Sequence, residues 1–261
     1  MPSVDETYLF IDGEYIRTIY REAMQRFWGL DGDLEPARLR YTGMSFRTYF
    51  YDSIDDAKRE GESEAVFQSR VAAQEQFFNE IRAVSGFHAR LGSVTGKKKR
   101  RQKEVDVLLA VDMLTHGLGG NMKKAILLAG DLDFRPIVET LVQRGVFVEV
   151  WFEKRSAAKE LYGAADSGRE IPFSELYSRS RESFIKTHPL PHRISGDSIP
   201  PGEPIKRGKL GTSTARLFHS DNCYRLWVEP FSGTSLKITV PDLTHIERLM
   251  EMEYEPIVWD V

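Results

Sequence analysis

The chain has 261 residues, of which 41% are hydrophobic and 29% charged, and its formal net charge is −3. These values are ordinary for a globular protein and exclude a polycation, so any nucleic-acid binding must come from a local patch. The single cysteine, Cys223, excludes an intrachain disulfide and argues against a cysteine-based zinc site. We therefore expect a cytoplasmic protein. No apolar run approaches the roughly 20 residues that span a bilayer, and the N-terminus lacks a signal-peptide pattern, so no membrane association is expected.

Strands and helices are predicted to alternate through the first two thirds of the chain. Apolar runs that indicate buried strands cover residues 8–11, 45–54, 87–94, 124–130 and 146–152. Between and after them, apolar residues recur at helical spacing over residues 14–28, 65–84, 104–118, 134–144 and 156–166. Strands too apolar to face water, alternating with helices, predict an α/β fold with a parallel sheet that helices cover on both faces.

The pattern changes after residue 186. Residues 187–204 hold five of the twelve prolines and no periodicity, which predicts a linker. Short strands and one short helix are expected beyond it. We therefore predict a main domain over residues 1–186, a Pro-rich linker over 187–204, and a small α+β or mostly β module over 205–261. This module would select a protein partner or substrate, or only cap the sheet.

Acidic residues mark the ends of two predicted strands. Asp12 follows the first strand, and Asp131 and Asp133 follow "AILLAG". Asp106 opens the helix that precedes the "AILLAG" strand. Since ligands bind at the carboxyl ends of parallel strands, we expect the four carboxylates in one cleft. Mg²⁺ or Mn²⁺ would relieve their mutual repulsion, because these ions take oxygen ligands.

Each aspartate taken alone has a simpler interpretation as a helix N-cap or a turn residue. The pair at positions i and i+2, Asp131 and Asp133 behind Gly130, is more specific. Phosphohydrolases of the haloacid dehalogenase type also use two aspartates two residues apart. Their pair ends the first strand, whereas the first strand here is followed by Asp12, Gly13 and Glu14, which argues against that class.

Three segments together carry a family resemblance. "FIDGEYI", "KEVDVLLAVDML" and "ILLAGDLDFRPIVETLVQRGVFVEV", in this order, resemble the NYN domain of LabA-like proteins, within the PIN-like nuclease superfamily, over roughly residues 8–173. The resemblance implies a Rossmann-like sheet, a carboxylate-bound Mg²⁺ or Mn²⁺ and RNA as the substrate. Asp12 matches the aspartate of the first strand, and Asp106 matches that of the middle helix. The "GD.DF" pair is Asp131 and Asp133.

By that resemblance the chain is expected to be a metal-dependent ribonuclease. The four matched aspartates would be both metal ligands and catalytic residues, and an activated water would cleave the phosphodiester to leave a 5′-phosphate and a 3′-hydroxyl. Three departures motivate a second hypothesis: Glu14 and Tyr15 stand where the family often has Asn, Glu104 where it has Gly, and Ala129 where it has Ser. The alternative is a catalytically weak or inactive NYN module that regulates by binding RNA or protein.

Two further acids and a basic run complete the expected site. Asp112 is typical of the family's middle helix but lies about 240° around that helix from Asp106, so Asp112 is expected either to contact the metal ligands rather than the metal or to be structural. Glu14 is also expected to contact the ligands. A basic run precedes Asp106 and is expected to form a loop, whose charges are either solvated or bind RNA phosphates. Arg135 is expected either to contact an RNA phosphate or to balance the negative charge of the aspartates. The basic residues are Lys97, Lys98, Lys99, Arg100, Arg101 and Lys103. The oligomeric state, including a homo-oligomer, stays open.

Overall fold

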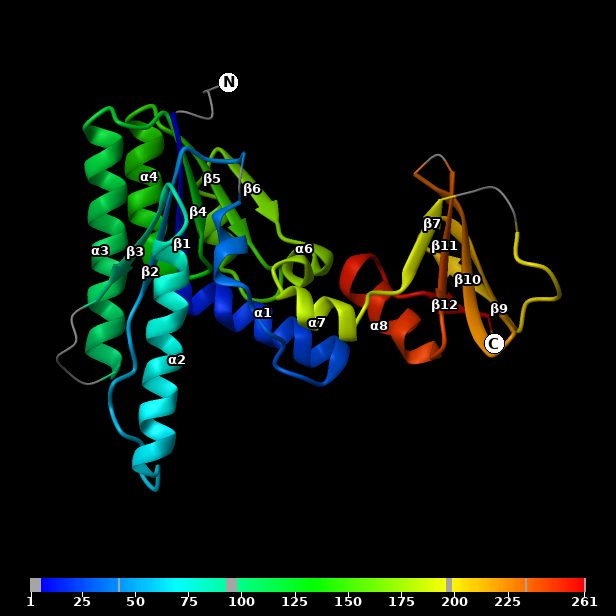
Figure 1. Ribbon diagram of the computed structural model, residues 1–261. Coiled ribbons are helices and arrows are strands. Elements are labelled where there is room, and N and C mark those ends of the chain that lie inside the picture. The colour runs from blue at the N-terminus through cyan, green and yellow to red at the C-terminus, as the bar shows by residue number, and fades with distance from the viewer. Residues whose placement is uncertain (1–5, 42, 93–97, 196–198, 233, 261) are drawn as a thin grey trace. The chain divides into compact units, whose positions relative to one another are not determined.

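A computed structural model describes residues 6–41, 43–92, 98–195, 199–232 and 234–260, with only the backbone described for 98–103, 192–195 and 234. Contacts divide the chain into two compact units (Figure 1). The first comprises Met1–Arg21 and Leu34–Ile171, and the second Glu22–Asp33 and Pro172–Val261. None of the helices in the described ranges combines the length and hydrophobicity of a membrane span.

The first unit is built on a parallel six-stranded sheet, which confirms the predicted α/β fold. The spatial order is β3-β2-β1-β4-β5-β6, so the chain extends the sheet to one side of β1 first and then to the other. This reversal between β1 and β4 is where doubly wound sheets open a crevice at their carboxyl ends. The strands are β1 (Thr7–Asp12), β2 (Arg47–Asp52), β3 (Phe87–Leu91), β4 (Lys124–Leu128), β5 (Phe147–Phe152) and β6 (Ser167–Glu170).

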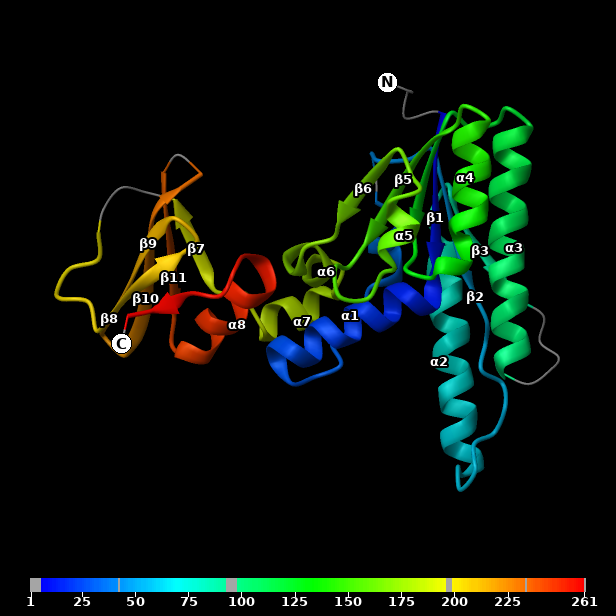
Figure 2. The same cartoon turned by 180° about the vertical axis from the view of Figure 1, so that it is seen from behind.

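Successive side chains of these strands point to opposite faces of the sheet, and both sets are buried, so helices cover both faces. On one face Phe10 and Leu127 belong to a core with Leu109 and Val138 of the paired helices α3 and α4, which Figure 2 shows side by side. On the other face Phe50 contacts Phe78 of α2. The helices are α1 (Gly13–Trp28), η2 (Pro36–Arg40), α2 (Glu64–Arg82), α3 (Lys98–Leu118), η3 (Leu132–Phe134), α4 (Arg135–Gln143) and α5 (Lys159–Tyr162).

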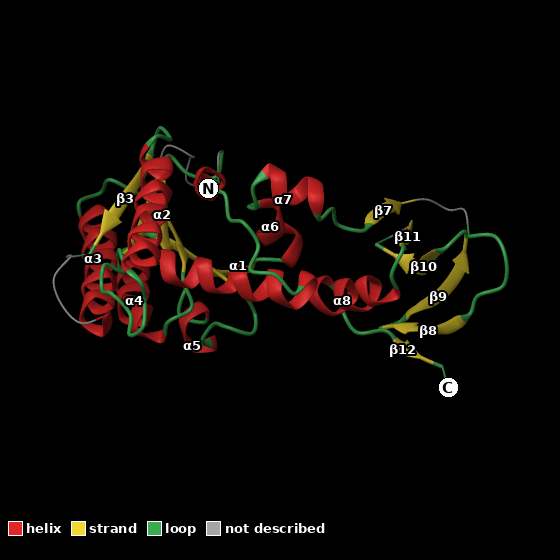
Figure 3. Ribbon diagram, turned by 60° about the horizontal axis from the view of Figure 1, so that its bottom comes forward, coloured by secondary structure: helices red, strands yellow, loops and turns green. Residues whose placement is uncertain are grey.

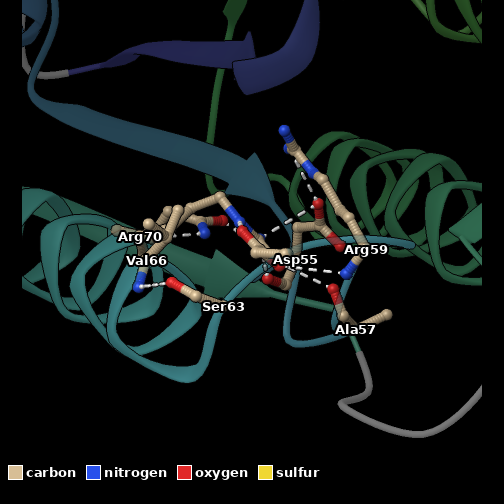
Figure 4. A network of polar contacts seen from close by, with 8 residues as sticks. Asp55, Ala57, Arg59, Ser63, Val66 and Arg70 are labelled. Carbon is tan, nitrogen blue, oxygen red and sulfur yellow. Dashed lines mark hydrogen bonds and ion pairs between the residues drawn. The ribbon is translucent and has the colours of Figure 1, made fainter.

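The connection from β2 to α2 is fixed by polar contacts (Figure 4). Ser63 caps α2, since its hydroxyl accepts a hydrogen bond from the backbone N–H of Val66. Arg70, on the second turn of α2, forms ion pairs with Asp55 at 3.2 Å and Glu62 at 2.8 Å. These contacts tie the segment that leaves the carboxyl end of β2 to the helix that follows.

The second unit contains an antiparallel sheet in the order β12-β8-β9-β10-β11-β7 (Figure 3). Helix α8 supplies buried Ile246, Leu249 and Met250, and the end of α1 adds Phe27, whose ring stacks on Phe173 at 4.8 Å. The elements are α6 (Phe173–Ser178), α7 (Glu182–Thr187), β7 (His192–Ser195), β8 (Lys206–Leu210), β9 (Ser213–Ser220), β10 (Cys223–Phe231), β11 (Thr234–Val240), α8 (Leu243–Glu253) and β12 (Val258–Trp259).

The stretch expected to be a linker, residues 187–204, contributes a strand to this sheet. β7 pairs with β11 from Leu236 to Thr239 as an edge strand. Prolines at 189 and 191 precede it, and an edge position tolerates such neighbours because one side of the strand needs no partner. The proline content therefore predicted a linker at a place where pairing with β11 produces a strand.

Candidate acidic site

Asp12 is the last residue of β1, beside the point where the strand order reverses. Its Oδ1 accepts a hydrogen bond from the backbone N–H of Tyr15 at 3.1 Å, so Asp12 also caps α1. Burial, with smaller contributions from the charges of Asp106, Asp52 and Glu14, raises the pKa of Asp12 to about 7 despite that hydrogen bond. The ionised form of Asp12 is therefore unfavourable, because its carboxylate is desolvated and lies among like charges.

Asp106 lies on α3, the helix that crosses from β3 to β4. Burial, followed by the charges of Asp131, Asp133 and Glu14, raises the pKa of Asp106 to about 6. The fold thus brings the four aspartates into one electrostatic neighbourhood. Alternation along β1 places Asp12 on the same face as Phe10, which is the face that α3 covers.

Asp131 and Asp133 lie on the turn between β4 and α4, and both are exposed. Oδ1 of Asp131 accepts a hydrogen bond from the backbone N–H of Asp133 at 2.9 Å, which caps η3. The ring of Phe134 is buried and anchors the turn from below. The capping interpretation is therefore true of Asp12 and Asp131, yet each uses one carboxylate oxygen and leaves the other available.

Asp52 is a further acid of this neighbourhood that the sequence did not assign to the site. It ends β2, its side chain is only 4% exposed, and it forms an ion pair with Arg17 of α1 at 2.7 Å. Burial raises the pKa of Asp52 to about 6, although Arg17 lowers it. Its position at the end of a strand, like that of Asp12, was the signal that could have identified it.

Gly13 and Gly130, each next to an aspartate, are required by close packing. A Cβ on Gly13 would lie 2.5 Å from Oδ2 of Asp52 and 2.7 Å from the carbonyl oxygen of Tyr51. A Cβ on Gly130 would lie 2.4 Å from the ring of Tyr15 and 2.6 Å from the carbonyl oxygen of Ser156. Glycine at both positions lets the acidic turns approach their neighbours.

Tyr15 has a structural role at the position where the resembled family often has Asn. Its hydroxyl accepts a hydrogen bond from the backbone N–H of Glu153 at 2.9 Å and is 3.1 Å from Oγ of Ser156. Its ring also packs against Gly130. Tyr15 therefore ties the segment after β5 to the turn that carries Asp131.

Of the two acids expected behind the ligands, only Glu14 belongs to the acidic neighbourhood. Glu14 is exposed at the start of α1, and its charge raises the pKa of Asp12, Asp52 and Asp106. Asp112 instead accepts hydrogen bonds from Tyr51 at 2.9 Å and from Arg90 at 2.9 and 3.2 Å. Asp112 joins α3 to β2 and β3.

The basic run differs from the loop that was expected. Helix α3 begins at Lys98, so the run forms its first turns. Lys97 lies outside the described residues, as do the side chains of Lys98, Lys99, Arg100, Arg101 and Lys103. A run of like charges lacks the apolar periodicity that predicts a helix. The run is helical here because it continues the amphipathic part of α3. Arg135 pairs with Glu139 at 2.7 Å rather than with the aspartates.

The donor atoms of this site are carboxylate oxygens, and together they carry an excess of negative charge. Such donors fit a hard divalent cation. Nevertheless, within the described ranges no three Asp, Glu, His or Cys side chains converge closely enough to hold a metal ion. Asp131, Asp133 and Glu14 are exposed side chains that can change rotamer. Coordination would therefore require these side chains to turn toward Asp12 and Asp106.

Comparison with known proteins gives one family match. The sequence model of the NYN domain matches residues 6–172. No curated protein matches the chain. A crystal structure of a protein of unknown function from Vibrio parahaemolyticus is similar, with 19% identity and a TM-score of 0.46, over 66% of this chain and 96% of that chain. At this identity and score the likeness carries no argument about activity.

Proposed function

Since the chain belongs to the NYN domain family, of the PIN-like nuclease superfamily, we propose that it is a ribonuclease that depends on Mg²⁺ or Mn²⁺. The observation that carries the proposal is the clustering of Asp12, Asp106, Asp131 and Asp133 at the strand-order reversal, where burial and, to a smaller extent, neighbouring acidic charges raise the pKa of Asp12 and Asp106. A bound cation would offset the repulsion between these carboxylates. In a cluster with a purely structural role, the repulsion would stay uncompensated.

The four aspartates would hold the cation, which lowers the pKa of a coordinated water and offsets charge on the phosphate when it is bound. Oδ1 of Asp12 and of Asp131 is occupied by a capping hydrogen bond. The Oδ2 atoms of these two residues would therefore be their contribution to the site. The basic first turns of α3, from Lys98 to Lys103, would attract the RNA backbone to the same helix that carries Asp106.

Glu14 and Tyr15 shape the site differently from the family pattern. Glu14 adds a negative charge beside Asp12, which would strengthen attraction for a cation and oppose the approach of a phosphate. Tyr15 is committed to Glu153 and Ser156, so it would keep the Gly130 turn in place rather than contact RNA. Glu14 would therefore favour cation binding, and Tyr15 would orient the Gly130 turn. Neither residue would serve to contact the substrate directly.

A second candidate function is a binding module of low or no activity, which regulates through RNA or protein. The absence of three converging ligands among the described residues favours it. The two functions differ in a measurable way: a module that only binds RNA would do so without a divalent cation and without producing fragments.

The test is cleavage of a labelled single-stranded RNA by the full chain with Mn²⁺ or with EDTA. Asp131→Asn keeps the size and capping ability of the side chain but removes its charge. Glu75→Gln, on an exposed residue of α2, is the matched control for charge removal. We expect cleavage with Mn²⁺ by wild type and Glu75→Gln, and a loss of at least about 100-fold in Asp131→Asn. Equal activity in Asp131→Asn and wild type would overturn the assignment.

A further inference from the structure

The antiparallel sheet of the second unit carries a row of cations across three of its strands. Arg207 on β8 lies opposite Arg216 on β9, Arg216 lies opposite Trp227 on β10, and Trp227 lies opposite Lys237 on β11. Directly opposite residues of antiparallel strands point to the same face. The four side chains therefore form one row on one face, which we call the basic face.

Two more cations extend the basic face beyond this row, because residues two positions apart along a strand share a face. Lys209 follows Arg207 on β8, and Arg225 precedes Trp227 on β10. Glu229 is the acid that the same alternation places among them, and Trp227 donates a hydrogen bond to it at 3.4 Å. The basic face thus carries five cations and one acid from β8, β9, β10 and β11.

Four of the five charges of the basic face are available to an external anion, whereas Arg225 is 20% exposed and also donates a hydrogen bond to the carbonyl oxygen of Ser220. Arg207 pairs with Glu203, and Arg225 pairs with Asp221, but these acids are 92% and 85% exposed. Ion pairs of this kind contribute little and open readily. Lys209, Arg216 and Lys237 have no ion-pair partner in the part of the chain that the structure describes. The five cations therefore outnumber Glu203, Asp221 and Glu229, the acids that pair with them or share their face.

The basic face contains one pair of like charges that repel each other. Like charges directly opposite each other in a sheet are destabilising, and Arg207 and Arg216 form such a pair. The opposite face already supplies the core, through buried Leu217, Leu226 and Ile238. On the basic face itself, Trp227 and Phe218 are only 1% and 3% exposed, so the aliphatic parts of the cationic side chains can help to cover them. A polyanion that lies across the strands would offset the repulsion between the charged ends of these side chains.

We propose that the basic face binds the phosphate backbone of single-stranded RNA. The inference rests on the proposed function, since RNA is the polyanion that the acidic site would cut. From Arg207 to Lys237 the row crosses three inter-strand steps of about 4.8 Å each, an extent of about 14 Å that suits several successive phosphates. The ring of Trp227 is only 1% exposed, so bases cannot stack on it. Recognition is electrostatic and independent of sequence.

The test is the affinity of the full chain for a fluorescein-labelled single-stranded RNA of about 20 nucleotides, measured by anisotropy in EDTA at several KCl concentrations. The variant is Arg216→Gln with Lys237→Gln. The control is Lys206→Gln: Lys206 is next to Arg207 in β8, but its side chain lies on the opposite face, near Trp259. A charge-conserving variant, Arg216→Lys with Lys237→Arg, shows whether charge alone suffices.

We expect the double Gln variant to bind about tenfold more weakly, and the slope of log K against log salt to fall by about 1.4, the value for two phosphate contacts on a single strand. The control and the charge-conserving variant should bind like wild type, and no variant should unfold at a lower temperature than wild type. Equal binding by the double Gln variant and wild type would overturn the proposal, as would an equal loss in Lys206→Gln.

The same samples separate this inference from the proposed function. Asp131→Asn should bind RNA like wild type although it does not cleave it. Binding that depends on Arg216 and Lys237 in a protein that never cleaves RNA would support the basic face and contradict the nuclease. Cleavage with binding that is insensitive to Arg216 and Lys237 would support the nuclease and contradict the basic face.

Discussion

Asp106 on α3 lies close enough to Asp12, at the end of β1, for its charge to raise the pKa of Asp12. The two residues are far apart in sequence, and the crossover of α3 from β3 to β4 brings them together. Burial contributes more to the pKa of Asp12 than this charge does. The pair therefore combines the two conditions, partial desolvation and like-charge proximity, that a divalent cation would relieve.

The first prediction concerns pH. Asp12 has a folded-state pKa of about 7, above the 3.8 of an ordinary aspartate, so the folded chain retains a proton that the unfolded chain has lost between these values. Its contribution to stability is therefore fully present below about pH 4 and is lost as the pH rises through 7. Without divalent cations, the free energy of unfolding should decrease from pH 5 to pH 8.

Asp12→Asn should flatten that decrease, because Asn still caps α1 but does not titrate. Urea unfolding at pH 5, 6, 7 and 8 in EDTA measures it, with Glu75→Gln as the control that should keep the slope of wild type. A slope that is the same in Asp12→Asn and wild type would show that the carboxyl of Asp12 is not the titrating group.

The second prediction separates two aspartates on one helix. Asp106→Asn should abolish cleavage while leaving the chain as stable as wild type or more so, because a repelled charge is removed. Asp112→Asn should cost about 1–3 kcal/mol of stability, since it weakens charged hydrogen bonds to Arg90 and Tyr51. Cleavage by folded Asp112→Asn should stay within a few-fold of wild type. Denaturant unfolding and a cleavage assay on both variants are the measurements, and the reverse pattern would contradict the account.

The third prediction concerns Arg17 and Asp52. Arg17→Ala leaves the buried carboxylate of Asp52 without its ion-pair partner, which should cost about 2–4 kcal/mol at pH 8. Adding Asp52→Asn to Arg17→Ala should restore most of the loss. A double-mutant cycle by thermal and urea unfolding measures the coupling, and two simply additive losses would mean that the pair does not interact.

The fourth prediction concerns the close approach at Gly13. Gly13→Ala should destabilise the chain by about 1–3 kcal/mol, because its Cβ would meet the carbonyl oxygen of Tyr51 at 2.7 Å. Gly168→Ala is the comparison, since its Cβ would meet a side-chain atom of Phe152 at 3.2 Å. Urea unfolding of both variants should show the larger loss for Gly13→Ala. Equal losses would mean that the β1–α1 turn has room to adjust.

Much of the parallel sheet could be predicted because its strands are continuously apolar and its helices periodic. The same patterns place Asp12 and Asp131 at strand ends. Asp52 has the same kind of position, but its burial and its pairing with Arg17 come from tertiary contacts between α1 and β2. The sequence likewise could not reveal that Tyr15 is committed to Glu153 and Ser156.

Other elements depended on long-range pairing or on neighbouring structure. β7 forms in a proline-rich stretch because β11 offers an edge, and α3 extends to Lys98 through a run of charges. The basic face arises from the register of four strands, which no local pattern reports. The LabA-like subtype and the cytoplasmic location stay predictions.

The most direct test of the central claim is the rate of RNA cleavage as a function of Mn²⁺ concentration for wild type and Asp12→Asn. The account predicts that wild-type cleavage is absent in EDTA and rises to saturation with Mn²⁺, and that Asp12→Asn is slower by at least about 100-fold at every concentration. Cleavage by wild type in EDTA at its full rate, or the same rate in Asp12→Asn and wild type, would contradict the claim that the acidic cluster cuts RNA with a divalent cation.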